Sequence, residues 1–191
     1  MALAVASLLA ERGGDGRARR LLTVAMAAAL AGDVLLLNES WFLFGLLAFL
    51  VTHLTYLALF RRGVGWFPSR LALAAILAVA AAVTAWEFPR LPSGLVVPVA
   101  VYTGVIALMV AQASGRAVAL GTQDAWLVAS GAALFMASDT MISINRFVLP
   151  FGWSNAAIMA TYYAGQILIL RHALVAARRI ADGDDLAASR L

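Results

Sequence analysis

The sequence contains no cysteine and no lysine, and only 13% of its 191 residues are charged. The absence of cysteine excludes disulfide bonds, thiol nucleophiles and cysteine-ligated metals. All fourteen basic residues are arginine, which a coding bias explains better than a chemical requirement. In contrast, 63% of the residues are hydrophobic and the mean hydropathy is +0.91. A water-soluble core cannot bury that share of apolar side chains, so the composition predicts an integral membrane protein.

Apolar segments of transmembrane length follow one another along the chain. A helix needs about 20 residues to cross the hydrocarbon core of a bilayer. Six segments approach that length, and short polar or glycine- and proline-containing breaks separate them, including one at residues 113–123. The segments are residues 20–37, 41–60, 69–86, 94–112, 124–143 and 154–176. The pattern predicts an all-α, polytopic transmembrane helix bundle with six full spans.

No internal repeat and no long soluble linker interrupts these spans, so residues 1–191 are expected to form a single integral membrane domain. Residues 1–10 are apolar but too short to cross a bilayer, and residues 11–20 are rich in arginine. Residues 1–20 are therefore expected to hold a partial helix and a basic loop. Residues 178–191 are polar, and we expect a frayed, solvated tail there.

The arginines are distributed unequally between the two sides of the predicted bundle. With six spans, twelve of them fall on the side of the C-terminus, and only Arg90 and Arg146 fall on the other side. Because cytoplasmic loops are enriched in positive charge, the C-terminus of this multi-pass protein is predicted to lie on the cytoplasmic side of the cell membrane. The arginines are scattered over short loops and form no single basic face, so nucleic acid is not an expected partner.

Two carboxyl groups lie inside the predicted spans, where an ionised group costs several kcal/mol unless it has a partner or a function. Asp33 lies four residues before the end of the first span, and Asp139 lies four residues before the end of the fifth. These two spans cross in the same direction, so both acids are expected about 6 Å below the same non-cytoplasmic face. Two acids at matched depth favour a shared functional site over two unrelated, hydrogen-bonded carboxyls.

Other polar side chains recur every three or four residues in the spans, so each group shares one helix face and is expected to point into the bundle. The candidate substrate-binding residues are His53, Tyr56, Ser143, Arg146, Tyr162, Tyr163 and Gln166. For the tyrosines, glutamine and serine, hydrogen bonds between helices explain the pattern equally well. A lone histidine is more often a satisfied core residue, and an arginine near a helix end can simply extend to the lipid headgroups.

Several other kinds of site are disfavoured. Glu39, Glu87 and Asp124 lie at predicted helix ends, where charge is tolerated, so we do not expect them in the site. A metal bound by the two aspartates and His53 lacks support, because neither an HExxH motif nor a paired-histidine spacing is present. No nucleophile elbow, phosphate-binding loop or dinucleotide-binding glycine motif occurs either. No metal and no cofactor is therefore expected.

Motifs around the two acids follow one another in a characteristic order. They are Gly32-Asp33-Val-Leu-Leu, Phe44-Gly45-Leu-Leu-Ala-Phe49, His53-Leu-Thr-Tyr56, Gly131-Ala-Ala-Leu-Phe135-x-x-Ser138-Asp139 and Tyr162-Tyr163-Ala-Gly-Gln166. With this order and these separations, the chain between residues 21 and 175 resembles the YhhN-like lysoplasmalogenases.

The resemblance implies a multi-pass membrane hydrolase that cleaves the sn-1 vinyl ether bond of lysoplasmalogen, a lyso-ether phospholipid, into a fatty aldehyde and a glycerophospho-base. It implies that Asp33 and Asp139 match the family's acids and that His53, Tyr56, Tyr162 and Tyr163 match its histidine and tyrosines. The expected partners are a lysophospholipid substrate and the bilayer, and no oligomeric state is predicted. The family also has a Lys-Pro-containing helix near its start. This chain begins inside that helix, so either the sequence starts late or the chain is a shortened variant.

The chemistry of a vinyl ether independently suits two carboxyl groups in an apolar cleft. Protonation of the β carbon creates an oxocarbenium ion, and water then adds to give a hemiacetal that collapses to aldehyde and alcohol. One carboxyl can supply the proton, while the other, ionised, stabilises the cation and takes a proton from water. The sequence does not assign the two roles, because such a pair titrates as a unit. Two other functions stay open: a small proton-coupled transporter and a non-catalytic membrane scaffold.

Overall fold

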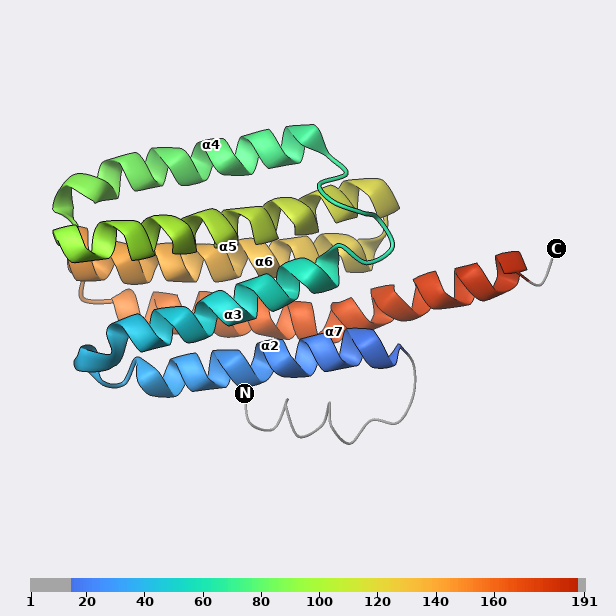
Figure 1. Cartoon of the computed structure of the whole chain (residues 1–191), viewed down its shortest axis with the longest axis horizontal. Helices are drawn as coiled ribbons and strands as arrows, with labels where there is room; N and C mark the ends of the chain where they lie inside the picture. The colour runs from blue at the N-terminus through green and yellow to red at the C-terminus, as the bar shows by residue number, and fades with distance from the viewer. Residues whose placement is uncertain (1–14, 189–191) are drawn as a thin grey trace.

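The computed structural model describes residues 15–188, and these residues form α-helices and short helical turns without any strand. The helices are α2 Gly16–Leu35, α3 Phe42–Phe60, α4 Arg70–Glu87, α5 Ser93–Leu120, α6 Gln123–Ser143 and α7 Ser154–Ala188. The turns are the 3-10 helices η1 Glu39–Trp41 and η2 Phe88–Arg90 and the π-helical turn η3 Ile144–Val148. The predicted all-α fold is confirmed (Figure 1).

Successive helices run in opposite directions, so every second connection lies at the same end of the bundle (Figure 1). Helix α5 is central and packs against α3, α4 and α6. Helix α2 packs on α3 and α7 packs on α6, whereas α2 and α7 make few contacts with each other. The bundle therefore has two arms, α2–α3 and α6–α7, which are joined through α5 and separated at their outer edges.

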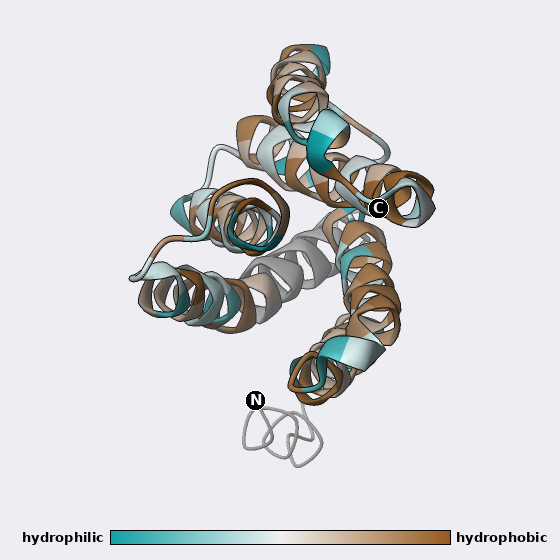
Figure 2. Cartoon of the chain, turned by 90° about the vertical axis from the view of Figure 1, so that its left-hand side faces the viewer, coloured by the Kyte–Doolittle hydropathy of each residue, from teal (hydrophilic) through white to brown (hydrophobic). Residues whose placement is uncertain are grey.

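The outer surface of the bundle is apolar. The end view in Figure 2 shows hydrophobic residues along the helices, and large apolar side chains such as Leu54, Leu71 and Val97 are exposed. Within residues 15–188, four helical segments are long and apolar enough to cross a membrane: Glu39–Phe60, Arg70–Arg90, Ser93–Leu120 and Gln123–Val148. These segments agree with an integral membrane protein, and the count of six spans stays a prediction.

One predicted break is wrong. Helix α5 continues through residues 113–120, and only Gly121 and Thr122 separate it from α6. Gly115 serves packing and not a turn, because a methyl group there would lie 3.1 Å from the Pro68 ring and 3.2 Å from the Ser69 amide nitrogen. The helix ends at Gly121, whose φ of 64° is a left-handed conformation that glycine adopts without strain.

The chain ends also differ from the predicted pattern. Helix α2 begins at Gly16, before the predicted start of the first span, and Asp15 caps it by accepting hydrogen bonds from two backbone amides. Helix α7 continues to Ala188, so much of the predicted polar tail at 178–191 extends the last helix. The partial helix predicted at residues 1–10 lies outside the described residues.

Glycines set the helix spacing around the two acids. A methyl group at Gly131 of α6 would lie 2.7 Å from the carbonyl oxygen of Gly165 of α7, and the reverse substitution meets the same limit. The two backbones therefore pack directly on each other, as small residues allow in membrane bundles. Next to Asp33, a methyl group at Gly32 would lie 2.6 Å from the Phe49 ring, so α2 packs closely on α3.

Candidate active site

Asp139, on α6, is held by side chains from two other helices. Its Oδ2 accepts a hydrogen bond from Tyr102 Oη of α5 and lies 3.1 Å from His53 Nε2 of α3. The Tyr102 Oη lies 2.8 Å from the same nitrogen, and the His53 ring is fully buried. The other ring nitrogen, Nδ1, is buried without a partner among the described residues, so a proton on Nε2 leaves no buried N–H unsatisfied. With the proton on Nε2, His53 donates a hydrogen bond to Asp139.

Asp33, on α2, accepts one side-chain hydrogen bond from the residues that the structure describes. Tyr162 Oη of α7 donates to Asp33 Oδ2 at 3.0 Å. The Tyr162 ring is 5% exposed and meets the Phe135 ring edge to face, with the ring centroids 5.2 Å apart. This packing fixes the tyrosine, and the hydrogen bond connects the two arms where α2 and α7 otherwise make few contacts.

Both aspartates line one cavity of about 290 Å³, which we call the α2–α7 cavity. Residues of α2, α3, α6 and α7 form its walls. Val34, Met159 and Tyr163 belong to the lining and are also exposed on the outside of the bundle. The cavity is therefore bordered by the apolar surface between the two arms, which is a lipid-facing surface in a membrane.

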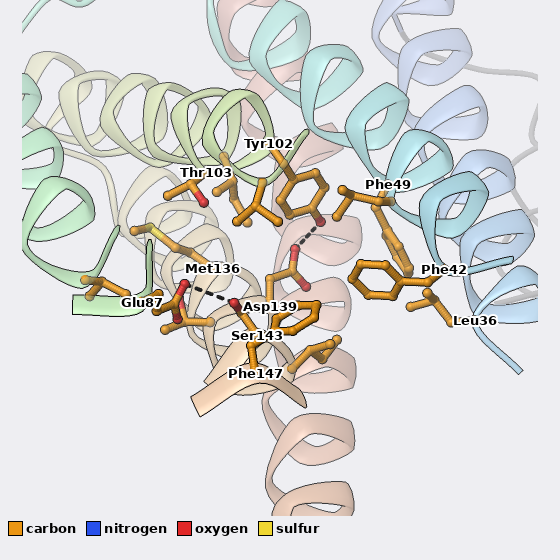
Figure 3. Close-up of a pocket in the computed structure, with 16 residues that line it drawn as sticks. Leu36, Phe42, Phe49, Glu87, Tyr102, Thr103, Met136, Asp139, Ser143 and Phe147 are labelled. Carbon is orange, nitrogen blue, oxygen red and sulfur yellow. Dashed lines mark hydrogen bonds between the residues drawn. The ribbon is translucent and has the colours of Figure 1, made fainter. Parts of the chain in front are cut away.

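Asp139 also lines a second cavity, of about 60 Å³, which we call the α4–α6 cavity (Figure 3). Figure 3 shows Glu87 and Ser143 on one side of Asp139 and Tyr102 on the other. Ser143 Oγ donates to Glu87 Oε2 at 2.9 Å, and Glu87 is only 3% exposed. Because Asp139 belongs to both linings, it lies between the two cavities.

The structure brings several of the predicted site residues together. Tyr162 and Tyr163 line the α2–α7 cavity with both aspartates, and Ser143 lines the α4–α6 cavity. His53 reaches Asp139 by the contact described above. Within residues 15–188, no group of three or more His, Cys, Asp or Glu side chains forms a candidate metal site.

Three other predicted site residues line neither cavity. Tyr56 Oη donates to Gln166 Oε1 at 2.5 Å, and both side chains are buried. The Arg146 side chain is exposed in η3, and its guanidinium lies 4.3 Å from the centroid of the Phe42 ring. The first two connect α3 to α7, and Arg146 lies near the bundle end beside the two aspartates.

Two residues of the site were missed by sequence reasoning. Glu87 was set aside as a helix-end acid, but its side chain is buried beside Ser143. The polar partners of Tyr102, His53 and Asp139, come from other helices. Tyr102 therefore belongs to no pattern of polar side chains that recur every three or four residues on one helix. No sequence signal singles out Tyr102, whereas an acid at the very end of an apolar span could have been retained as a candidate.

Apolar helices and an outward-facing apolar surface define a multi-pass membrane protein, and two carboxyl groups line one of its cavities. The family model described as "YhhN family" matches residues 1–173, and the chain belongs to this family. The predicted resemblance is confirmed.

Relatives with established names support the same family. The protein is 30% identical over 165 residues to "Lysoplasmalogenase TMEM86A" of Bos taurus, covering 83% of this chain and 67% of the relative. It is 37% identical over 165 residues to "Lysoplasmalogenase" of Mycobacterium bovis, covering 78% of this chain and 61% of the relative. The matched part of this chain thus covers 67% of the length of the first relative and 61% of the length of the second. No solved structure matches it.

Proposed function

We propose that this protein hydrolyses the sn-1 vinyl ether bond of a lysoplasmalogen to a fatty aldehyde and a glycerophospho-base. The names of the relatives support the reaction. The observation that carries the proposal is that Asp33 and Asp139, from helices far apart in the sequence, line one cavity. This arrangement supports an acid and a base acting on the same small group.

The hydrogen bonds support a division of roles between the two carboxyls. Asp139 Oδ2 takes donors from both Tyr102 and His53, and two donated hydrogen bonds stabilise a carboxylate. Within residues 15–188, Asp33 accepts one side-chain hydrogen bond, and apolar side chains form most of the cavity beside it, which disfavours an uncompensated charge. We therefore assign Asp33 as the initial proton donor and Asp139 as the anion that stabilises the cation.

The proposed cycle consumes one water and returns both carboxyls to their starting states. Asp33 gives its proton to the β carbon, and the resulting oxocarbenium ion lies beside the Asp139 carboxylate. Water adds to the cationic carbon and loses a proton to Asp139, which gives a hemiacetal. Asp139 then protonates the glycerol oxygen as its bond to carbon breaks, and the hemiacetal hydroxyl returns a proton to Asp33.

The apolar surface between α2 and α7 supports a lipid that reaches the site from the bilayer. Val34, Met159 and Tyr163 border the α2–α7 cavity and are exposed, so an alkenyl chain can remain against apolar side chains throughout. Arg146 is exposed near the same bundle end, and it stays our candidate contact for the lipid phosphate.

The decisive experiment measures fatty aldehyde released from lysoplasmenylethanolamine by the purified protein. Asp33→Asn and Asp139→Asn are each expected to lower the rate by at least about a hundredfold, the usual contribution of a general acid or base. Glu39→Gln is the matched control, because Glu39 is an exposed acid in η1 at the same bundle end. The saturated 1-alkyl lysolipid serves as substrate control, since without a double bond it forms no oxocarbenium ion by protonation. Absence of aldehyde with the wild type, or full activity in both Asn variants, would overturn the proposal.

The predicted orientation has its own test, which the cysteine-free chain makes simple. Asn38 and Gln123 are exposed at opposite ends of the bundle. In intact cells, an impermeant maleimide is expected to label Asn38→Cys and to leave Gln123→Cys unlabelled. The reverse pattern would place the C-terminus on the outer side.

A further inference from the structure

Glu87, the last residue of α4, is buried, with 3% of its surface exposed. Its Oε2 accepts the hydrogen bond from Ser143, but its Oε1 is buried and has no hydrogen-bond partner among the described residues. A buried carboxyl oxygen without a partner is unfavourable, and it is commonly satisfied by water or a ligand. Because Glu87 lines the α4–α6 cavity, that cavity is where such a partner can lie.

Apolar side chains form most of the lining of the α4–α6 cavity, but the polar groups beside Asp139 suit water. Its volume is about 60 Å³, and one water needs about 10–15 Å³ of such space and two to four polar partners. Glu87 and Ser143 offer polar groups on one side, and Tyr102 and Asp139 offer them on the other (Figure 3). The α2–α7 cavity is larger, about 290 Å³, and borders the exposed apolar surface, so it is the better candidate for the lipid chain.

The position of the cavity links the end of the bundle to the acid site. Helix α4 ends at Glu87, and Ser143 is the last residue of α6. Ser143 lies one helical turn beyond Asp139, which corresponds to about 6 Å along the helix axis. The α4–α6 cavity therefore approaches Asp139 from the helix ends, whereas the α2–α7 cavity approaches it from the lipid-facing surface.

We propose that the α4–α6 cavity is the water-binding site of this hydrolase and that Glu87, together with Ser143, positions water for addition beside Asp139. The inference rests on the proposed function and extends it, since hydrolysis in an apolar bundle needs a separate supply of water. Glu87 Oε1 accepts a hydrogen bond from the bound water, whose lone pair then faces the cationic carbon. A new C–O bond forms, and the proton of that water passes to Asp139. Glu87 is thus a positioning residue.

Competition between water and methanol tests this role. Methanol adds to the same oxocarbenium ion and loses its proton to Asp139, but the product is a mixed methyl acetal that keeps its glycerophospho-base. The ratio of acetal to aldehyde does not depend on how much protein is folded. The assay uses lysoplasmenylethanolamine with dilute methanol on the wild type, Glu87→Leu, Glu87→Gln and Ser143→Ala.

Glu87→Leu is expected to lower kcat about tenfold and to raise the acetal-to-aldehyde ratio about fivefold, as loss of one hydrogen bond to the bound water would predict. The KM for the lipid is expected to be unchanged, because the lipid binds through the other cavity. Glu87→Gln keeps an acceptor oxygen and should lie between Glu87→Leu and the wild type. Glu39→Gln, an exposed acid outside both cavities, is expected to match the wild type.

The outcomes separate this inference from the proposed function. If the wild type releases no aldehyde, the proposed function is wrong. If aldehyde forms but Glu87→Leu and Ser143→Ala both keep the wild-type ratio and kcat, the water site is wrong while the aspartate pair stands. If Glu87→Leu does not fold, as judged by size-exclusion chromatography, the nearly isosteric variants Ser143→Ala and Glu87→Gln decide by the same ratio.

Discussion

The two ends of the bundle use polar side chains in opposite ways. One end of the bundle holds the α3–α4 connection. There the Gln112 side chain is fully buried, accepts a hydrogen bond from the Phe67 amide at 2.7 Å and donates to the Gly65 carbonyl at 2.9 Å. At the other end, which we call the acid end, Asp33 and Asp139 are bonded by side chains and line a cavity. Polar groups that are satisfied by backbone partners hold the fold, whereas groups that face a cavity retain capacity for a ligand.

The same contrast appears on a single helix. Asp15, at the start of α2, accepts hydrogen bonds from the amides of Arg17 at 2.9 Å and Ala18 at 3.1 Å and from the Arg62 guanidinium. Asp33, near the end of α2, accepts a hydrogen bond from Tyr162 and borders a cavity. One residue type therefore caps a helix at one end and is available for chemistry at the other.

The largest effect is expected at the acid end. The double variant His53→Leu with Tyr102→Phe removes both donors to Asp139 and should lower the rate of aldehyde release about a thousandfold, because each hydrogen bond to a charged group contributes about 1.5–3 kcal/mol. The single variant Tyr102→Phe keeps one donor and should lose about tenfold. A double variant within tenfold of the wild type would show that Asp139 does not depend on these donors.

At the opposite end, Gln112→Ala should reduce stability and not chemistry. The substitution removes the hydrogen bonds of the buried Gln112 side chain to the Phe67 amide and the Gly65 carbonyl, so we expect a loss of about 2 kcal/mol in the free energy of unfolding. The rate per folded molecule should stay unchanged. Denaturant unfolding in mixed micelles measures the first and aldehyde release the second, with the exposed Gln123→Ala as control. A lower rate at unchanged stability would contradict the division between the two ends.

Tyr56→Phe tests the layer between the ends. The hydroxyl of Tyr56 bonds Gln166 and borders neither cavity, so its removal should cost about 1 kcal/mol of stability. Both kcat and KM should be retained. A raised KM in steady-state kinetics would instead make Tyr56 a substrate contact, as the sequence pattern allows.

The smallest effect concerns Asp15 and depends on pH. Burial acts to raise the pKa of Asp15, but hydrogen bonds from the Ala18 amide, the Arg62 guanidinium and the Arg17 amide lower that pKa overall. A lowered pKa in the folded state stabilises the fold above the ordinary value, near pH 4, and this contribution is lost as the pH falls through the lowered pKa. Asp15→Asn keeps a capping side chain without the charge. Its melting temperature should be slightly lower than that of the wild type at pH 7, and the difference should shrink toward pH 3. A constant difference would exclude the charge as its source.

The helices and the acid pair could be predicted from the sequence because both leave a local signal. Long apolar runs predict helices whatever their neighbours are, and Asp33 and Asp139 are conspicuous in such runs. Their similar depth follows from counting residues, because successive helices alternate in direction and the two helices that carry the acids cross the same way. The break predicted around Gly115 was wrong. The sequence does not distinguish a glycine that makes room for Pro68 of a neighbouring segment from a glycine that ends a helix.

The rest of the site could not be predicted, because it depends on contacts between helices. Glu87 is buried by packing beside Ser143. The sequence shows only that Glu87 lies at a helix end, and it does not show whether another helix covers that end. The partners of Tyr102 lie 49 and 37 residues away along the chain. Conversely, Tyr56 and Gln166 share the polar pattern of site residues but bond each other.

The hydrogen bond from Tyr162 to Asp33 has a consequence for the order of events in turnover. It spans the gap through which a lysolipid would move between α2 and α7. Admission of a substrate and release of an aldehyde would each disturb the partner of the proposed proton donor. Substrate entry and proton donation would therefore both depend on the Asp33 carboxyl. A variant that widens the gap between α2 and α7 should also slow proton transfer from Asp33.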